Sequence, residues 1–251
     1  MKKLLLFLLV LYAPNISKGI TTTYAELLCQ DPITYNCLTV EERLSQVCAE
    51  LQINPHEQFN SLTWEFLWPD DREREIILKV NRINIKPYRE LLLAIPRIMA
   101  NLTYYDFSPF PFIIDPPLEP VLIWDPSLLA WGAYGIEGAL LNWGPAVGGK
   151  DYCPDIGRSC RTKTGEFRIL RKEGRYYHSK SYPVGCSGKN CAPMPYAVFF
   201  APYYAFHAGT LPGKNASHGC VRVLYEDAQW LSEIFVQIGT KVIIREYPNL
   251  R

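Results

Sequence analysis

The feature that most constrains the fold is a series of short apolar segments that begins at Val121. Each segment is rich in β-branched, aromatic and aliphatic residues, and Gly, Pro, Asp or Asn separates it from the next. Segments of this length between turn residues are typical of β-strands. They read VLIWDP, LLAWGAYG, GALLNWGPAVGG, EFRILRK, YAVFFAPYYAFHAG and TKVIIR. This pattern predicts a mainly β domain, a β-sandwich or barrel, over residues 119–251.

One helix is expected within this domain, in the late segment YEDAQWLSEIFVQIG. Its apolar residues Leu231, Ile234, Phe235 and Ile238 have the spacing of one helical face. Gly239 can end the helix, because glycine accepts the left-handed backbone that closes many helices. We therefore predict that this helix packs on the β domain.

The region before the β domain is predicted to be a small α or α+β module. Residues 20–54 form a small helical, cysteine-containing segment, in which Thr39 and Glu42 have the spacing of a capping box. Residues 55–100 combine the helical pattern DDREREIILKVNRIN with the apolar strand LLLAIP. A connection rich in proline and aromatic residues follows at 101–118 and is expected to lie on the next domain.

The segment at residues 55–100 resembles the back half of a LysM glycan-binding module. The resemblance rests on a short helical unit, an Asn-x-Asn sequence and an apolar strand that ends in Ile-Pro. It implies binding to cell-wall glycan. The alternative is a structural cap on the main domain.

The N-terminus has the pattern of a secretory signal peptide. Two lysines precede an apolar run from Leu4 to Tyr12, and Ser17-Lys18-Gly19 has small residues at the positions that precede a cleavage site. The apolar run is shorter than the roughly 20 residues of a membrane-spanning helix. We predict that residues 1–19 are removed and that the mature chain, without a membrane span, is exported to the periplasm or cell wall. The net charge of +1 gives no overall attraction to nucleic acid.

The eight cysteines indicate disulfides, because disulfides persist in oxidising compartments. Two close pairs lie in loops, Cys153 with Cys160 and Cys186 with Cys191, and they can pair locally or cross-pair. A structural zinc site is the competing interpretation for these cysteines, although paired C-x-x-C halves are absent from the sequence. If Cys220 stays free, one of the other seven has no partner within the chain.

The segment FHAGTLPGKNASHGCVRV carries the residues best suited to chemistry. His207 ends one predicted strand, Cys220 begins another, and a loop of small residues joins them. A nearby imidazole can take the proton of a thiol and so produce a nucleophilic thiolate. Arg222 shares the strand face of Cys220, where its guanidinium favours the thiolate and can bind a carboxylate. These three residues predict nucleophilic catalysis.

The turn before the cysteine has its own expected role. Gly219 permits a close backbone approach, and the N–H groups of Gly219 and Cys220 can form an oxyanion hole. Two alternatives stay open at this point. The cysteine and histidine can be structural, or His207, His218 and Cys220 can bind a metal ion, although no fourth ligand is evident.

The same segment resembles the signature of the L,D-transpeptidase catalytic domain of the YkuD type. HAGT…ASHGCVRVLYEDAQWL contains the histidine, the Ser-His-Gly-Cys core and the following arginine of that family, and RTKTGEFRI resembles its strand entry. The resemblance implies that His207 is the general base, Cys220 the nucleophile and Arg222 the basic substrate-binding residue. The residues that it assigns to the turn around the oxyanion hole are Ser217, His218 and Gly219.

The resemblance implies an exported peptidoglycan enzyme that needs no cofactor and no metal. The thiolate attacks a tetrapeptide stem after the diamino acid at position three, D-alanine leaves, and an amine on a second stem or a wall-anchored protein resolves the thioester. A carboxypeptidase that uses water, or a non-catalytic cell-wall-binding protein, are the alternatives. An NlpC/P60-type hydrolase is disfavoured, because its cysteine precedes its histidine along the chain.

Overall fold

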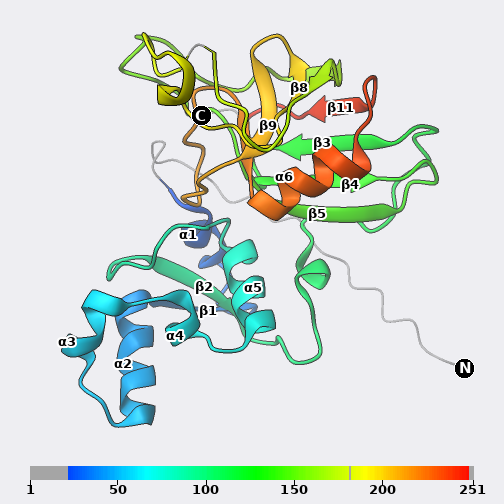
Figure 1. Ribbon diagram of the computed structural model, residues 1–251. Helices are drawn as coiled ribbons and strands as arrows, with labels where there is room; N and C mark the ends of the chain where they lie inside the picture. Colours follow the sequence, from blue (N-terminus) through cyan, green and yellow to red (C-terminus); the bar gives the residue numbers. More distant parts are fainter. Residues whose placement is uncertain (1–21, 181, 249–251) are drawn as a thin grey trace, which may run out of the picture.

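The computed structural model describes residues 22–180 and 182–248, so the predicted signal peptide lies outside the described residues. Within these stretches no helix has the length and apolar character needed to cross a membrane. Figure 1 shows a small N-terminal module packed against a larger β domain.

The helices and helical turns are α1 Tyr24–Leu28, α2 Val40–Leu51, α3 Pro55–Gln58, η1 Phe59–Ser61, α4 Trp64–Leu67, α5 Asp71–Val80, η2 Tyr104–Phe107, η3 Gly188–Asn190, α6 Tyr225–Trp230 and η4 Leu231–Phe235. The strands are β1 Tyr35–Thr39, β2 Leu92–Pro96, β3 Val121–Asp125, β4 Ala130–Tyr134, β5 Leu140–Val147, β6 Gly165–Arg168, β7 Arg171–Lys172, β8 Val198–Ala201, β9 Tyr204–Ala208, β10 Val221–Val223 and β11 Lys241–Ile244.

The N-terminal module is a single α+β unit. Strands β1 and β2 pair antiparallel, although more than fifty residues separate them in the sequence. The predicted capping box starts α2: the Thr39 N–H donates to Glu42 Oε2 at 2.7 Å, and the Glu42 N–H donates to Thr39 Oγ1 at 3.2 Å. Helices α2 and α5 contribute to one buried core that includes Leu44, Ile77 and Leu93. The boundary expected between residues 54 and 55 therefore lies inside one packed unit, and its LysM-like glycan binding stays a prediction.

The β domain is one nine-stranded sheet that curls around its own core. The strand order is β6-β11-β3-β4-β5-β10-β9-β8-β7. Most neighbours are antiparallel, but β3 pairs parallel with β11 and β9 pairs parallel with β10. Large side chains such as Trp124, Trp131 and Phe206 are fully buried in the core. The predicted mainly β fold is confirmed.

The late helix differs from its predicted form. It runs only over α6, continues as the π-helical turn η4 and ends at Phe235. Ile234 and Ile238 are exposed, whereas the predicted Leu231 and Phe235 do contact the core, together with Ala228. Asp227 is also buried and accepts a hydrogen bond from Trp131 Nε1 at 3.2 Å. The expected apolar face is thus only partly correct, because the helix does not keep its 3.6-residue period.

The proline-rich connection lies along the β4–β5 hairpin. Tyr134 Oη donates to the Pro111 carbonyl at 2.7 Å, and the Leu140 N–H donates to the Phe112 carbonyl at 2.8 Å. Phe110 is buried in the core beneath this hairpin. The connection is therefore part of the packed structure.

Three disulfides are present in the described residues: Cys29–Cys37, Cys153–Cys160 and Cys186–Cys191. Both loop pairs thus close locally. Cys48 and Cys220 are free, and Cys48 is buried in the N-terminal module. With Cys220 free, seven cysteines remain, and Cys48 is the one of them that has no disulfide partner.

The loop that joins β9 to β10 rests on the N-terminal module. The Leu211 N–H donates to Asn84 Oδ1 at 2.7 Å, and Asn84 Nδ2 donates to the Gly209 carbonyl at 2.9 Å. Further along the loop, the Tyr24 N–H donates to the Gly213 carbonyl at 2.7 Å. The module thus holds the first half of the segment that leads to Cys220.

Candidate active site

The candidate site lies where the parallel strands β9 and β10 run side by side. Their register places Arg222 opposite His207 and Val221 opposite Phe206. Side chains alternate along a strand, so Phe206 and Val221 enter the core while His207 and Arg222 share the other face. Cys220 lies directly before β10, two residues from Arg222, and so belongs to the same face. The fold therefore brings together the three residues that the sequence singled out for chemistry.

His207 is buried, and its ring orientation is fixed by one hydrogen bond. Nδ1 lies 2.8 Å from the Ala208 carbonyl oxygen, which can only accept, so Nδ1 carries the proton and Nε2 carries a lone pair. Burial lowers the pKa of His207 to about 4, while the bond to Ala208 raises it and Arg222 lowers it further. The imidazole is therefore neutral near pH 7, in the tautomer that can accept a proton at Nε2.

Cys220 is partly exposed but lies against an apolar cluster. This cluster contains Met194, Phe199 and Ala205, and the thiol lies 3.7 Å from the Tyr203 carbonyl oxygen. Burial raises the pKa of the thiol above its ordinary value, an effect that the Ala205 N–H and the Arg222 guanidinium oppose. The resting state is thus a neutral thiol and a neutral imidazole on the same face of the paired strands. The proton has to move when the sulfur attacks.

Arg222 is packed closely against the backbone on its strand face. Gly209 makes room for it, because a Cβ on that glycine would lie 2.9 Å from Arg222 Cγ. Burial lowers the pKa of Arg222, and the nearby Cys220 and Tyr182 raise it. The guanidinium is a fixed positive charge that can attract the carboxylate of a substrate.

The turn before Cys220 is closed by Ser217. Its hydroxyl donates to the Cys220 carbonyl at 2.5 Å and accepts from the Gly219 N–H at 3.0 Å. Gly219 has φ +129°, a conformation that other residues rarely adopt. The Gly219 N–H, expected to face a substrate carbonyl, is therefore engaged within the turn.

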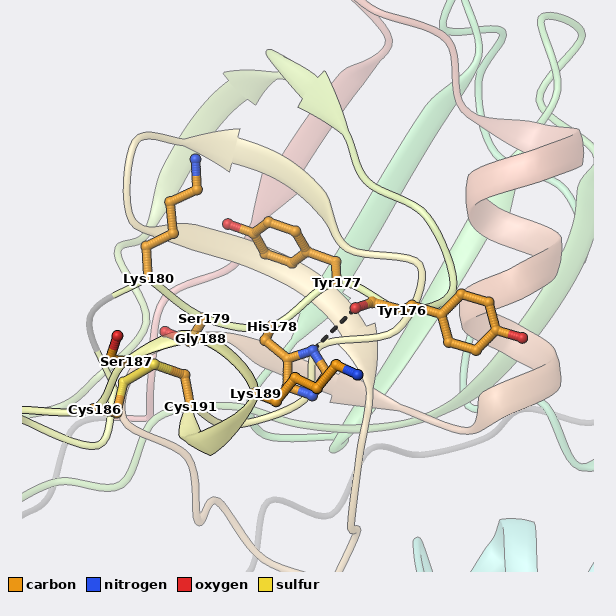
Figure 2. A pocket seen from close by; sticks show the side chains of 10 residues that line it. All are labelled: Tyr176, Tyr177, His178, Ser179, Lys180, Cys186, Ser187, Gly188, Lys189 and Cys191. Carbon is orange, nitrogen blue, oxygen red and sulfur yellow. Dashed lines mark hydrogen bonds between the residues drawn. A yellow bond between two sulfur atoms is a disulfide. The ribbon is translucent and has the colours of Figure 1, made fainter.

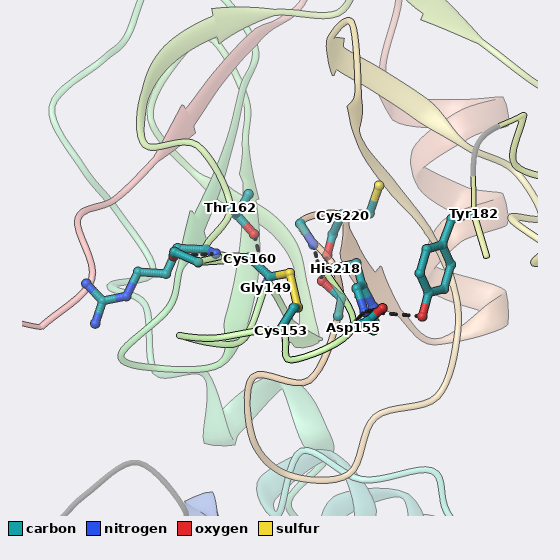
Figure 3. Close-up of a disulfide and its surroundings, with 12 residues drawn as sticks. Gly149, Cys153, Asp155, Cys160, Thr162, Tyr182, His218 and Cys220 are labelled. Atoms are coloured by element: carbon teal, nitrogen blue, oxygen red, sulfur yellow. Dashed lines mark hydrogen bonds and ion pairs between the residues drawn. A yellow bond between two sulfur atoms is a disulfide. The ribbon is translucent and has the colours of Figure 1, made fainter. Parts of the chain in front are cut away.

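His218 is directed away from the candidate nucleophile. Nε2 lies 2.9 Å from Asp155 Oδ2 and 3.2 Å from Tyr182 Oη, and the Tyr182 and His218 ring centroids are 4.2 Å apart. The bond to His218 lowers the pKa of Asp155. In Figure 3 the Cys220 sulfur points away from the His218 ring. Among the described residues, His207, His218 and Cys220 do not form a metal-binding group.

Asp155 and Tyr182 are the residues of this site that the sequence did not indicate. Asp155 lies in the loop that the Cys153–Cys160 disulfide closes, and Tyr182 lies before the Cys186–Cys191 loop, so no local periodicity relates either to the segment around Cys220.

Figure 2 shows a pocket of about 480 Å³ in the region between β7 and β8. It is lined by the segment from Tyr176 to Lys180 and by the loop that the Cys186–Cys191 disulfide closes. Tyr177 lines the pocket and also packs in the apolar cluster that contacts Cys220. Lys180 and Lys189 give this pocket positive charge.

Residues 129–244 match the family model of the L,D-transpeptidase catalytic domain, YkuD. This part of the chain is therefore an L,D-transpeptidase catalytic domain, the domain of a cysteine-dependent transpeptidase. The resemblance that rested on the Ser-His-Gly-Cys segment is confirmed.

The structure is also similar to solved L,D-transpeptidases. One from Xylanimonas cellulosilytica DSM 15894 has a TM-score of 0.49 and 24% identity, over 63% of this chain and 74% of that chain. One from Mycobacterium smegmatis has a TM-score of 0.41 and 22% identity, over 51% and 59% of the two chains. One from Mycobacterium tuberculosis H37Rv has a TM-score of 0.40 and 24% identity, over 51% and 57%. The chain thus spans less than two thirds of the mycobacterial structures, and no curated protein matches it.

Proposed function

We propose that this chain is an exported L,D-transpeptidase that acts on the tetrapeptide stems of peptidoglycan. The observation that carries the proposal is the parallel register of β9 and β10, which aligns His207 with Arg222 on the face of Cys220. The family match supplies the reaction class, a cysteine-dependent transpeptidase. The signal-like N-terminus supports export, and three disulfides suit an oxidising compartment.

The first half-reaction acylates the enzyme. Cys220 Sγ attacks the carbonyl carbon of the diamino acid at position three, and His207 Nε2 takes the thiol proton as the new C–S bond forms. The tetrahedral intermediate collapses, the C–N bond to D-alanine breaks, and the imidazolium returns the proton to the leaving amine. Arg222 binds the carboxylate of the stem. The product is a thioester on Cys220, the thiol proton ends on the amine of D-alanine, and His207 is neutral again.

The second half-reaction transfers the acyl group to an amine. His207, neutral again, takes a proton from the attacking amine, and the Cys220 thiolate leaves and is protonated. A second stem gives a 3-3 cross-link, and a wall-anchored protein gives an anchored product. Water in place of the amine gives a tripeptide, which is the carboxypeptidase alternative and uses the same residues.

One incubation tests the function and separates a second stem from water as the acceptor. Purified disaccharide-tetrapeptide is incubated with the mature chain, and mass spectrometry follows dimer, tripeptide and released D-alanine. We expect cross-linked dimer from the wild-type chain and none from Cys220→Ser, because an oxygen nucleophile lacks the low pKa of sulfur. Cys48→Ser is the matched control and should keep its activity if it folds. Tripeptide alone would identify a carboxypeptidase, and the absence of every product would contradict the proposal.

A further inference from the structure

A second group of reactive side chains lies behind the turn that precedes Cys220. The sulfurs of Cys153 and Cys160 and a ring nitrogen of His218 all lie within 4.8 Å of one another. Both cysteines are buried, and they form a disulfide (Figure 3). None of the three takes part in the reaction proposed above. Two thiolates and an imidazole are the ligands that zinc prefers in structural sites.

The His218 ring is already oriented as a metal ligand. Its Nε2 bonds to the Asp155 carboxylate, so in the neutral ring Nε2 carries the proton and Nδ1 carries the lone pair. Nδ1 is buried and has no hydrogen-bond partner anywhere in the described parts of the chain. A carboxylate that holds the far nitrogen of a histidine is the usual support of a metal-binding imidazole. The lone pair of His218 Nδ1 therefore meets no protein donor and is available to bind a cation.

The backbone around the two cysteines is held without the disulfide. The Cys153 N–H donates to the Arg158 carbonyl at 2.9 Å, and the Cys160 N–H donates to the Lys150 carbonyl at 3.2 Å. At the base of the loop, Arg161 Nε pairs with Asp151 Oδ1 at 2.6 Å. The loop thus has hydrogen bonds that can keep both sulfurs near His218 after the S–S bond opens.

We propose that Cys153, Cys160 and His218 form a redox-gated site for one thiophilic divalent cation, such as Zn²⁺. In the disulfide state the sulfurs are bonded to each other and the site is closed. A dithiol reductant supplies two electrons and two protons, breaks the S–S bond and is itself oxidised to a disulfide. The cation then displaces the two thiol protons and binds Cys153 Sγ, Cys160 Sγ and His218 Nδ1, and water completes the tetrahedron.

The dimensions of the site agree with this assignment. With Zn–S bonds of about 2.3 Å, two sulfurs on a tetrahedral zinc lie about 3.8 Å apart. The present group spans no more than 4.8 Å, so separation of the two bonded sulfurs is the main movement required. Metal and disulfide consume the same two sulfurs and therefore exclude each other.

The other two disulfides provide matched controls within the chain. Neither Cys29–Cys37 nor Cys186–Cys191 belongs to a metal-binding group in the part of the chain that the structure describes. The full mature chain carrying Cys220→Ser is reduced with a phosphine, freed of reductant and titrated with Co²⁺. We expect one equivalent to bind, with sulfur-to-cobalt charge-transfer absorption, and no such absorption from the oxidised protein. Added Zn²⁺ should displace the cobalt.

Five further variants in the same background locate the ligands. Cys153→Ser/Cys160→Ser should abolish the charge-transfer signal, whereas Cys186→Ser/Cys191→Ser and Cys29→Ser/Cys37→Ser should retain it. His218→Ala keeps both cysteines, so it tests the site even if the Cys153→Ser/Cys160→Ser variant does not fold; it should bind cobalt at least tenfold more weakly. Asp155→Asn should weaken binding by about 10- to 100-fold, the usual effect of losing such a support.

Reoxidation supplies a readout that is independent of cobalt. Reduced, zinc-loaded protein is treated with oxidised glutathione and mapped by peptide mass spectrometry. Cys153 and Cys160 should remain thiols while Cys186 and Cys191 form their disulfide again. The proposal is overturned if the reduced protein binds no cobalt, if binding survives in both the cysteine and His218→Ala variants, or if zinc leaves reoxidation of Cys153 and Cys160 unchanged.

Discussion

His207 shows how one buried side chain sets the chemistry of the pair. Its Nδ1 bond to Ala208 leaves Nε2 as the acceptor, and burial keeps the ring neutral at physiological pH. The raised pKa of Cys220 means that the thiolate is not present in advance. The pair therefore depends on a general base at the moment of attack, which differs from a stable thiolate–imidazolium pair.

The first prediction concerns this base. His207→Gln should slow acylation of Cys220 by imipenem by about 10²–10⁴ at pH 7, the usual contribution of general-base catalysis. The deficit should shrink as the pH rises, because thiolate formed by hydroxide needs no base. His56→Gln, in the exposed helix α3, is the control and should match the wild-type rate.

The pH profile of the wild-type chain checks the same assignment. The acylation rate should fall only below about pH 5, because protonation of a base whose pKa is about 4 removes its function. An acid limb centred near pH 6.5, the ordinary pKa of histidine, would contradict the buried neutral imidazole. Stopped-flow fluorescence of acylation across pH 4–8 distinguishes the two outcomes.

At the scale of an element, helix α6 shows how tertiary packing can override a local sequence pattern. Asp227 lies in its first turn, where an ionised carboxylate would interact favourably with the helix dipole. The structure instead buries it against Trp131. Burial raises the pKa of Asp227 to about 7, and the charge of Lys79 opposes this rise. The side chain is thus partly protonated at neutral pH.

The second prediction follows from this raised pKa. The unfolded carboxyl has a pKa near 3.9, so the folded state binds the proton more tightly and loses stability as the pH rises from about 4 through 7. Asp227→Asn removes that loss while it keeps an acceptor for Trp131. The variant should therefore equal the wild type near pH 4 and exceed it by about 4 kcal/mol at pH 8. Urea unfolding at both pH values measures this difference.

A neighbouring carboxyl provides the control for Asp227. Glu233→Gln alters an exposed acid in η4 and should change stability by about 0.5 kcal/mol or less at either pH. A pH-independent effect of Asp227→Asn would show that the carboxyl is not the titrating group.

Local signals predicted some elements well and failed where distant contacts decide. Spacing over a few residues was enough to predict three features: the capping box at Thr39, the strand that ends at Pro96, and the shared face of Cys220 and Arg222. The pairing of β1 with β2 and the role of Asp155 could not be predicted, because each depends on segments far apart in the chain. Ile234 was assigned wrongly because the π-helical turn breaks the helical period.

On the scale of the whole molecule, the N-terminal module supports the segment that carries the candidate site. Asn84 fills three hydrogen-bonding roles for the loop after β9: its side chain contacts Gly209 and Leu211, and its N–H donates to the Leu211 carbonyl at 3.1 Å. Arg82, buried beside it, accepts at its carbonyl from the Gly213 N–H at 3.1 Å. The loop thus has fixed partners outside its own domain.

The third prediction tests this support. Asn84→Ala removes the side-chain partner of the Leu211 N–H and the Gly209 carbonyl and should lower the free energy of unfolding by about 0.5–1.5 kcal/mol. It should also slow acylation of Cys220, because the loop then holds β9 and β10 less firmly. Asn60→Ala, exposed in η1, is the control. If Asn84→Ala loses stability but is acylated at the wild-type rate, the contact of Asn84 with the loop has only a structural role.

The docking of this loop also limits how the chain can be divided and recombined. A chimera that joins residues 119–251 to a foreign targeting domain would discard the partners of Gly209, Leu211 and Gly213, although it would keep every residue of the family match. Such a chimera would inherit the reactive groups without the surface that aligns them. A transferable unit has to include the receiving edge of the module, Tyr24 and residues 82–84. The smallest portable catalyst is therefore nearly the whole of the chain that the structure describes.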